Sequence, residues 1–438
     1  MNDLEQLVVS PGGCLTGTVD VPGDKSISHR AVMLGSIAHG TTNVSGCLMG
    51  DDVRSTIAAF RAMGVDIVEH SDQRLSIHGR GFGALRAPSG VLDMGNSGTS
   101  IRLLAGLLAS APFAIEMSGD DSLRRRPMRR VTEPLELMGA NIRTTSQGTP
   151  PLHILASSKL TAIRYELPVA SAQVKSALLL AGINAAGLTV VVEPVATRDH
   201  SERMLRAFGV ELATADNEIS LLGPQQLRAT DIDVPRDISS AAFFLVAAAI
   251  VEGSELTLKG VGINPTRTGV IEILREMGAN IRLFNQTNAS SEPVADIEVR
   301  GARLRGIDIP ARLIPSAIDE FPAIFIAAAC AEGVTRLNGA GELRHKESDR
   351  IEAMAVGLSA LGVEVLTGAH SIQITGRNGL SGGCAIESRG DHRIAMAFAM
   401  AALKCDRPLT ILNCHAIGTS FPGFVEIAGQ AGLKIEQR

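Results

Sequence analysis

A chain of 438 residues, 45% of them hydrophobic, is long enough for two domains with sizeable cores. Its 41 basic and 46 acidic residues leave a net charge of −5, which excludes a protein whose main partner is bulk nucleic acid. The longest apolar stretch covers only residues 241–251, well short of the roughly 20 residues that a membrane span requires. Residues 1–5 lack the basic region of a signal peptide, so we expect a cytoplasmic protein with no membrane partner.

The first informative segment is residues 22–30, with the sequence PGDKSISHR. A turn there precedes an apolar helix over residues 28–39, with Ser26 or Ser28 as its N-cap. Lys25 and Arg30 would add their charges to the partial positive charge of the helix start, an arrangement that suits an anion. An ordinary capped helix with two solvated cations explains this segment equally well.

A glycine ends an amphipathic helix and precedes a strand-like stretch six times, roughly every 70 residues. Each is expected in the left-handed conformation that closes a helix. The six are Gly64, Gly139, Gly209, Gly278, Gly362 and Gly432. The repeat predicts an α/β fold of six similar units, three in each of two domains, and a long solenoid is the alternative.

Each unit also contains an earlier helix that is apolar nearly all round and is therefore expected to be buried. These helices are predicted over residues 28–39, 99–110, 172–183, 238–251, 319–331 and 391–403. The later helices, such as 199–208 and 348–361, have charges every three or four positions and are expected outside. No P-loop occurs, Gly79-x-Gly81-x-Gly83 lacks the Rossmann spacing, and the cysteines have no metal-binding spacing.

Polar residues that suit anions gather at the starts of these helices. They are found in residues 94–100 (MGNSGTS, with Thr99 or Ser100 as cap), 124–127, 171–175, 198–200, 318–322, 346–350 and 389–393. Solvated surface charge explains any single cluster but not the set, because cations are unfavourable at a helix start unless an anion lies opposite. The pattern predicts small substrates with two or more anionic groups in an interdomain cleft, with Asp319 and Glu347 able to move protons.

These clusters resemble those of the 5-enolpyruvylshikimate-3-phosphate synthases over essentially the whole chain. The segments that carry the resemblance are PGDKSISHR at 22–30, GNSGT at 95–99, RRPM at 125–128, SAQ at 171–173, KESDR at 346–350 and DHR at 391–393. The resemblance implies a two-domain inverse α/β barrel of six βαβαββ repeats, three per domain. It also implies a discontinuous domain of residues 1–23 plus 238–438, a second domain of residues 24–237, and an active site in the cleft.

By this resemblance, the enolpyruvyl group of phosphoenolpyruvate moves to the 5-hydroxyl of shikimate 3-phosphate through a tetrahedral ketal, and phosphate is released. Asp319 is the expected base and Glu347 the expected acid, while Lys25 stabilises charge and shares in proton transfer. The implied shikimate-3-phosphate ligands are Lys25, Ser26, Arg30, Ser171, Ala172, Gln173, Arg198, Asp319 and Lys346. The implied phosphoenolpyruvate ligands are Lys25, Gly98, Arg126, Gln173, Arg350 and Arg393. A monomer without metal or cofactor is expected.

The sequence departs from many members of that family at residues 417–422 (IGTSFP), where they have a lysine. Thr419 and Ser420 there resemble the divergent bacterial branch, whose members often tolerate glyphosate through an alanine methyl beside the ligand. Gly98 occupies that position here, so we expect sensitivity.

Two alternatives to this function remain. The related UDP-N-acetylglucosamine enolpyruvyl transferases have an asparagine after the first lysine, where this chain has Ser26, and a cysteine in the loop here formed by residues 119–126. A non-catalytic anion-binding protein is the second alternative, and it has no use for acids such as Asp319 and Glu347 among its cations.

Overall fold

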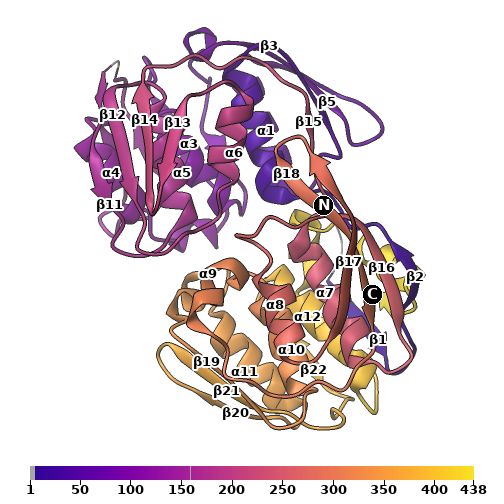
Figure 1. The fold of residues 1–438 in the computed structure, drawn as a ribbon. Helices are drawn as coiled ribbons and strands as arrows, with labels where there is room; N and C mark the ends of the chain where they lie inside the picture. The colour runs from indigo at the N-terminus through magenta and orange to yellow at the C-terminus, as the bar shows by residue number, and fades with distance from the viewer. Residues whose placement is uncertain (1–4, 158) are drawn as a thin grey trace. The chain divides into compact units, whose positions relative to one another are not determined.

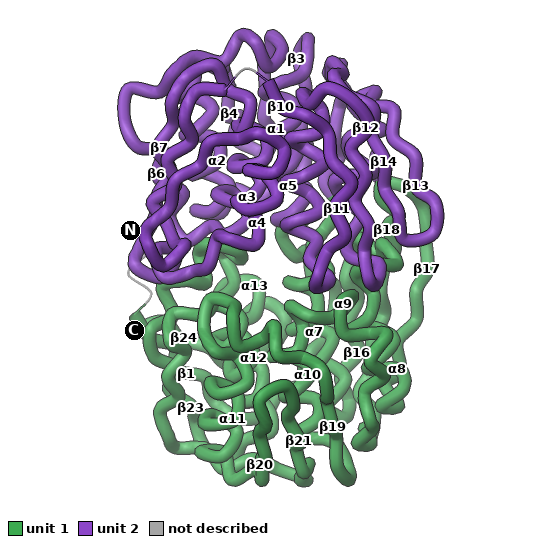
Figure 2. Tube along the Cα trace, turned by 90° about the vertical axis from the view of Figure 1, so that its left-hand side faces the viewer, with its two compact units in different colours: residues 1–24, 235–288, 292–438 green, residues 25–234, 289–291 purple. Residues whose placement is uncertain are grey.

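The computed structural model describes residues 5–157 and 159–438, so residues 1–4, part of the segment behind the cytoplasmic prediction, lie outside the described chain. The chain forms two compact units (Figure 2). Unit 1 comprises residues 1–24, 235–288 and 292–438, and unit 2 comprises residues 25–234 and 289–291. The chain therefore leaves unit 1 after Asp24 and returns to it at Pro235.

Unit 2 contains three sheets, whose strand orders are β15-β3-β5-β4, β6-β7-β9-β8 and β10-β12-β14-β13, with β11 pairing β12. The strands are β3 (His39–Ser45), β4 (Asp66–Glu69), β5 (Leu75–Arg80), β6 (Leu92–Asp93), β7 (Ile115–Ser118), β8 (Ile142–Arg143), β9 (Leu152–Ile154), β10 (Leu160–Thr161), β11 (Arg164–Glu166), β12 (Ala185–Val192), β13 (Leu212–Ala215), β14 (Glu218–Gly223) and β15 (Ile232–Asp233). The helices are α1 (Lys25–Ile37), α2 (Asp51–Ala62), α3 (Gly98–Leu107), α4 (Arg129–Leu137), α5 (Ala172–Gly182) and α6 (His200–Ala207).

Unit 1 also contains three sheets, with strand orders β22-β23-β1-β24, β17-β18-β16-β2 and β19-β21-β20. The strands are β1 (Gln6–Ser10), β2 (Thr16–Val19), β16 (Glu255–Gly262), β17 (Asn280–Ala289), β18 (Glu292–Arg300), β19 (Val334–Asn338), β20 (Glu364–Thr367), β21 (Ser371–Thr375), β22 (Ala385–Glu387), β23 (Leu409–Leu412) and β24 (Lys434–Gln437). The helices are α7 (Ile238–Ile250), α8 (Gly269–Glu276), α9 (Ile314–Ala317), α10 (Phe321–Ala329), α11 (Arg350–Ala360), α12 (His392–Ala401) and α13 (Phe424–Gln430).

One pairing pattern recurs in these sheets. In β15-β3-β5-β4 a parallel pair is followed by two antiparallel pairs, and β6-β7-β9-β8 has the same sequence of pairings. The sheet that joins both ends of the chain, β22-β23-β1-β24, repeats it with β1 supplied from the N-terminus. The sheet of β19, β21 and β20 has the two antiparallel pairs of this pattern, and it packs against α10 and α11 (Figure 1).

The core of each unit is a group of three apolar helices. In unit 2, α3 contacts both α1 and α5, and Arg30 of α1 donates a hydrogen bond to Ser176 of α5. In unit 1, α7, α10 and α12 contact one another. Every residue of α7 and α10 is buried, as the unbroken apolar runs predicted. Glycine lets helix backbones approach closely, as at Gly106 of α3 beside Ala177 of α5. Large aromatic residues are scarce in these cores, because the chain has one tyrosine and no tryptophan. Among the described residues, no helix is long and apolar enough to cross a membrane.

The six helix-closing glycines are confirmed, with φ angles between +80° at Gly362 and +113° at Gly432. Both predictions of an N-cap were wrong. Helix α1 already begins at Lys25, and the hydroxyl of Ser28 inside it accepts a hydrogen bond from Leu48 N at 2.9 Å. Helix α3 is capped by Ser97, whose hydroxyl accepts from Ser100 N.

Two further expectations need correction in detail. The helix predicted over residues 319–331 is present as α10 but begins at Phe321, so Asp319 lies in the turn between α9, which ends at Ala317, and α10. Proline at the second position of α10 favours a helix start there. The first turn of α6 does not lie outside, since His200, Ser201 and Glu202 are all buried.

A close contact between the backbones of α3 and α5 in unit 2 gives a test of this packing. A Cβ atom on Gly106 of α3 would lie 2.1 Å from the carbonyl oxygen of Ala177 in α5, a contact with rigid backbone. We expect Gly106→Ala to destabilise unit 2 by about 3 kcal/mol, the upper range for overpacking. Urea unfolding measures the change.

Gly429 in α13 is the matched control, because a Cβ atom there meets nothing within 4 Å. Gly429→Ala is expected to be neutral or to stabilise by up to about 1 kcal/mol. Equal effects of the two substitutions would contradict the close crossing of α3 and α5.

Candidate active site

The starts of three buried helices come together in unit 2. Gln173 in the first turn of α5 donates from Nε2 to Thr99 Oγ1 in the first turn of α3, at 3.3 Å. Arg30 of α1 donates from Nη2 to Ser176 Oγ of α5, at 2.9 Å. Helix starts present N–H groups and partial positive charge, so this end of the helix group suits anions. The predicted residues placed there are Lys25, Ser26, Arg30, Gly98, Ser171, Ala172 and Gln173.

The guanidinium group of Arg30 is buried and joins α1 to α5 and α6. Its Nε donates to Ser201 Oγ in α6 at 2.8 Å, and its Nη1 donates to the carbonyl of Ser26 at 3.0 Å. Arg198 lies just before α6, so Arg30 connects the segment that carries Arg198 to α1 and α5. Ser171 is the N-cap of α5, where its hydroxyl accepts from Val174 N.

A second group of cations surrounds the start of α3. A Cβ atom on Gly98 would lie 2.9 Å from Arg126 Nη1 and 3.0 Å from Arg102 Nη1, so both guanidinium groups lie beside this glycine. Arg126 donates to the Asn96 side-chain oxygen, and Arg102 donates to Gln173 Oε1 at 2.7 Å. Two arginines thereby flank the backbone of Gly98, and the lack of a side chain at this glycine allows an anion to approach the backbone N–H.

Lys25 is held by a carboxylate that the sequence reasoning did not single out. Its Nζ lies 2.9 Å from Asp52 Oδ2, and the side chain of Asp52 is only 8% exposed. Asp52 lies in the first turn of α2, where an acidic residue is expected in any helix. The sequence therefore contained no separate signal for this pair.

The predicted residues of unit 1 form one connected cluster of charges. Lys346 Nζ lies 3.0 Å from Asp319 Oδ1, and Arg350 Nη1 lies 3.3 Å from the same oxygen. Arg350 Nη2 lies 2.6 Å from Glu347 Oε2. Arg393 Nη1 donates to the backbone carbonyl of Asp319 at 2.9 Å. All five residues that the resemblance assigned to this half of the chain are thus in contact.

Arg350 is the centre of that cluster, with a side chain only 1% exposed. Its Nε lies 2.9 Å from Oδ2 of Asp391, a fully buried carboxylate that also caps α12. Burial alone would lower the pKa of Arg350, but Asp391, Glu347 and Asp319 outweigh it and raise the pKa above its ordinary value. Burial would raise the pKa of Asp391, but Arg350 holds that pKa below its ordinary value. The pair is therefore an ion pair at neutral pH.

Arg393 is supported by a second buried carboxylate. Glu320 Oε1 lies 3.6 Å from Arg393 Nη1 and 3.8 Å from Arg267 Nη2, and the Glu320 side chain is fully buried.

Thr419 lies in the segment where many family members have a lysine. Its hydroxyl donates to the carbonyl of Ala416 at 2.7 Å.

The residues that sequence reasoning missed are Asp52, Asn96, Arg102, Glu320 and Asp391. Arg102 had a detectable signal, because an arginine inside an otherwise apolar helix needs a buried partner. Asp391 was part of a recognised segment but received no role of its own. Asp52 and Glu320 follow ordinary helix-start patterns, and only the fold brings them to their cations.

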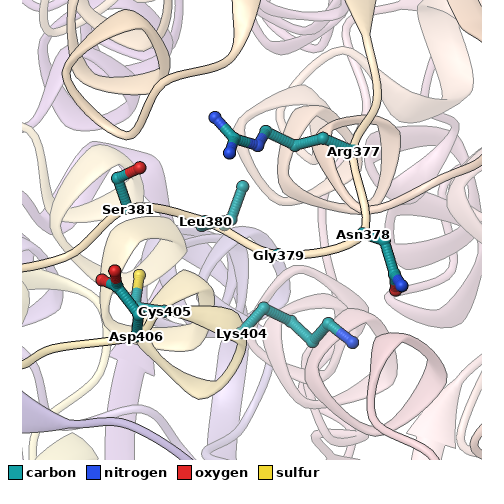
Figure 3. Close-up of a pocket in the computed structure, with 8 residues that line it drawn as sticks. All are labelled: Arg377, Asn378, Gly379, Leu380, Ser381, Lys404, Cys405 and Asp406. Carbon is teal, nitrogen blue, oxygen red and sulfur yellow. The ribbon is translucent and has the colours of Figure 1, made fainter.

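A separate surface pocket of about 480 Å³ in unit 1 contains none of the predicted residues. Figure 3 shows its lining, which is Arg377, Asn378, Gly379, Leu380, Ser381, Lys404, Cys405 and Asp406. Burial raises the pKa of the Cys405 thiol to about 12, so this thiol is not a nucleophile at neutral pH.

Comparison with known proteins identifies the family. A family model described as EPSP synthase (3-phosphoshikimate 1-carboxyvinyltransferase) matches residues 9–427. The 3-phosphoshikimate 1-carboxyvinyltransferase of Halorhodospira halophila is 58% identical over 428 residues, which cover 98% of this chain and 96% of that protein. A solved EPSP synthase from Acinetobacter baumannii is 53% identical, with a TM-score of 0.88 and 99% of both chains covered. The chain belongs to the EPSP synthase family.

The EPSP synthase family match spans every candidate residue from Lys25 to Arg393. The 3-phosphoshikimate 1-carboxyvinyltransferase of Methylococcus capsulatus is also 58% identical, over 97% of each chain. The enolpyruvyl transferase NikO from Streptomyces tendae is only 20% identical but has a TM-score of 0.81, so it shares the mixed α/β fold.

The lowered pKa of Asp391 gives a pH-dependent test of the Arg350 cluster. A carboxyl group whose pKa is lower in the folded state stabilises the fold above its unfolded pKa, and this contribution is lost as the pH falls through the folded pKa. We expect Asp391→Asn to lower the free energy of unfolding by about 3 kcal/mol at pH 7, because it removes the charged partner of the buried Arg350. This loss of stability relative to the wild type should shrink below about pH 4, where Asp391 of the unfolded wild type takes up a proton.

Urea unfolding of both proteins between pH 3 and pH 7 measures this deficit. Asp72→Asn is the control, because the Asp72 carboxylate is exposed and its ion pair with Arg74 lies at the surface, where such pairs contribute little to stability. A deficit in Asp391→Asn that stays constant across this range would contradict the ion pair.

Proposed function

We propose that the chain transfers the enolpyruvyl group of phosphoenolpyruvate to the 5-hydroxyl of shikimate 3-phosphate and releases phosphate. This reaction belongs to the shikimate pathway, which leads to chorismate and the aromatic amino acids. The observation that carries the proposal is the connected cluster of Asp319, Lys346, Glu347, Arg350 and Asp391, in a chain that matches EPSP synthases over its length. The cluster combines two acids for proton transfer with cations for anionic substrates.

For shikimate 3-phosphate, we assign the phosphate group to Ser171, Ala172, Gln173 and Arg198. The start of α5 supports this assignment, because its N–H groups and the Ser171 hydroxyl lie at a positive helix end. Ser26, Arg30, Asp319 and Lys346 would contact the ring hydroxyls. Lys25, beside them at the start of α1, would lie between the two substrates.

For phosphoenolpyruvate, Arg350 and Arg393 would bind the carboxylate, while Arg126, Lys25, Gln173 and the Gly98 N–H would bind the phosphate. The two terminal nitrogens of Arg350 now contact Asp319 and Glu347. A substrate carboxylate would replace one of these contacts. A carboxylate that loses a cationic partner binds a proton more strongly, so substrate binding would prepare these acids for proton transfer.

In the proposed reaction, Asp319 takes the proton of the 5-hydroxyl group while the oxygen of that hydroxyl group attacks C2 of phosphoenolpyruvate. Glu347 gives a proton to C3, which becomes a methyl group and leaves a tetrahedral ketal. The methyl group then returns a proton, the double bond forms again, and phosphate leaves with its electron pair. Lys25 stabilises the charge on the phosphate and shares in the proton transfer. No step calls for a metal or cofactor.

We also propose that the six sheets belong to six βαβαββ units, which form two inverse α/β barrels. The recurring order of one parallel and two antiparallel strand pairs supports this organisation. The proposed ligands of each substrate come from both units. The proposal therefore requires one shared active site that closes when substrates bind. A cytoplasmic monomer is proposed.

The test is a phosphate-release assay with the wild type and Glu347→Gln. The wild type should release phosphate with shikimate 3-phosphate and not with UDP-N-acetylglucosamine, the acceptor of the rival enolpyruvyl transferases. Glu347→Gln should lower kcat by roughly 10²- to 10⁴-fold, the range for a lost general acid, and leave both KM values within a few-fold. Its amide preserves the size of the side chain.

Glu364→Gln is the matched control for this variant, because Glu364 is exposed in β20 and lies outside the site. Turnover of folded Glu347→Gln at the wild-type rate would remove Glu347 from its catalytic role. Phosphate release with the nucleotide sugar alone would favour the rival function.

Gly98 gives a prediction about inhibition by glyphosate, an analogue that occupies the phosphoenolpyruvate site of the family. A methyl group at this position would meet Arg126 Nη1 at 2.9 Å and Arg102 Nη1 at 3.0 Å, so it would narrow the space beside the phosphate cations. We expect wild-type sensitivity and a glyphosate concentration for half-inhibition at least about ten-fold higher in Gly98→Ala, as for a change of one methyl group in a tight pocket.

Gly83→Ala is the control for glyphosate inhibition, because a Cβ atom there meets nothing within 4 Å. The comparison is made at a fixed phosphoenolpyruvate concentration. Identical inhibition of the wild type and Gly98→Ala would show that this glycine does not border the inhibitor.

A further inference from the structure

A buried ionic cluster in unit 2 takes no part in the mechanism above. Lys175 Nζ lies 2.9 Å from Glu193 Oε2 and 2.7 Å from Glu202 Oε1. The Lys175 side chain is 1% exposed, and those of the two glutamates are 4% exposed. Nζ also donates to the backbone carbonyl of Thr197 at 3.4 Å. Each of the three N–H bonds of the ammonium group therefore has an acceptor.

Neither stability nor attraction of a substrate explains this cluster. It places one ammonium group between two carboxylates, and the cost of desolvating buried ions offsets most of what their attraction contributes. Apolar residues of similar volume would serve the core equally well. Because the cluster has one more carboxylate than ammonium groups, its own charge does not attract a phosphate dianion either. Its value must therefore lie in the geometry that it imposes.

The cluster fixes the residue that precedes Arg198. Thr197 donates to Glu193 Oε1 from its backbone N–H at 3.2 Å and also from its hydroxyl, while its carbonyl accepts from Lys175. The N–H, hydroxyl and carbonyl of Thr197 are thus all held by Lys175 and Glu193. The backbone that leads into Arg198 has little freedom as a result.

The other end of this segment is tied to the same helix. Ser176, next to Lys175 in α5, accepts a hydrogen bond from the Ser201 hydroxyl at 2.7 Å. Arg30 donates to both serines. Two successive residues of α5 therefore hold Thr197 and Ser201, on either side of Arg198. Ser171 caps the same helix one turn before Lys175.

We propose that Lys175 is a positioning residue for the phosphate of shikimate 3-phosphate, because it fixes the segment carrying Arg198 relative to Ser171. The inference rests on the proposed function, which takes Ser171 and Arg198 as ligands of that phosphate. Without the ammonium group, Glu193 and Glu202 repel each other, and the Thr197 carbonyl loses its donor. The backbone on the N-terminal side of Arg198 is then no longer fixed relative to α5.

The test is the double variant Lys175→Met/Glu202→Gln, which removes one positive and one negative charge and so preserves the net charge of the cluster. Initial rates are measured with shikimate 3-phosphate and with shikimate, the same acceptor without its phosphate. We expect kcat/KM with shikimate 3-phosphate to fall about 10- to 100-fold, the range for a ligand misplaced by up to 1 Å. Activity with shikimate and the KM for phosphoenolpyruvate should stay within about three-fold.

Two further variants keep the test decisive. Phe60→Leu, in the core of unit 2 on α2, controls for a general loss of stability and should leave the preference for the phosphorylated acceptor unchanged. If the double variant does not fold, Glu193→Gln replaces it, because the amide keeps the volume but weakens the contacts with Lys175 and Thr197. A wild-type preference in whichever variant folds would overturn the inference.

Ser171→Ala separates failure of this inference from failure of the proposed function. If Ser171→Ala lowers the preference for shikimate 3-phosphate and the Lys175 variants do not, the positioning role alone is wrong. If Ser171→Ala and Arg198→Lys both leave the preference unchanged, the phosphate assignment itself is wrong, and the inference fails with it.

Discussion

A buried guanidinium group needs partners that offset the cost of removing its charge from water, and in the candidate site of unit 1 these partners are carboxylates. Arg350 is almost completely buried and contacts Asp319, Glu347 and Asp391. Its position requires α11, the turn before α10 and the start of α12 to meet at one point. The fold of unit 1 and the chemistry of its site therefore depend on the same ion pairs.

Unit 2 also contains a buried arginine, Arg30, but its partners differ from those of Arg350. Lys25 there is paired with the carboxylate of Asp52, whereas Arg30 donates to the hydroxyl groups of Ser176 and Ser201 and to the carbonyl of Ser26. Helices α3 and α5 approach closely at Gly106, and a hydrogen bond from Gln173 to Thr99 joins their starts.

The helix-closing glycines and the buried apolar helices could be predicted because each depends on local sequence. A left-handed residue after a helix favours glycine, and an unbroken apolar run such as α7 has no exposed face. The capping residue of α3 could not be predicted, because three hydroxyl residues compete within Ser97 to Ser100. Asp52 could not be assigned to Lys25 for a different reason, since their pairing depends on how α1 and α2 pack.

The internal carboxylates of unit 1 also limit which substrates the proposed site accepts. A ligand must offer an anion able to replace Asp319 or Glu347 on Arg350, or the exchange leaves a buried charge unpaired. A neutral analogue makes no such exchange and leaves both acids held by their cations. In the proposed mechanism, binding of the substrate carboxylate and release of Asp319 or Glu347 from Arg350 are therefore a single event, which gives a role to carboxylates in a site rich in arginine.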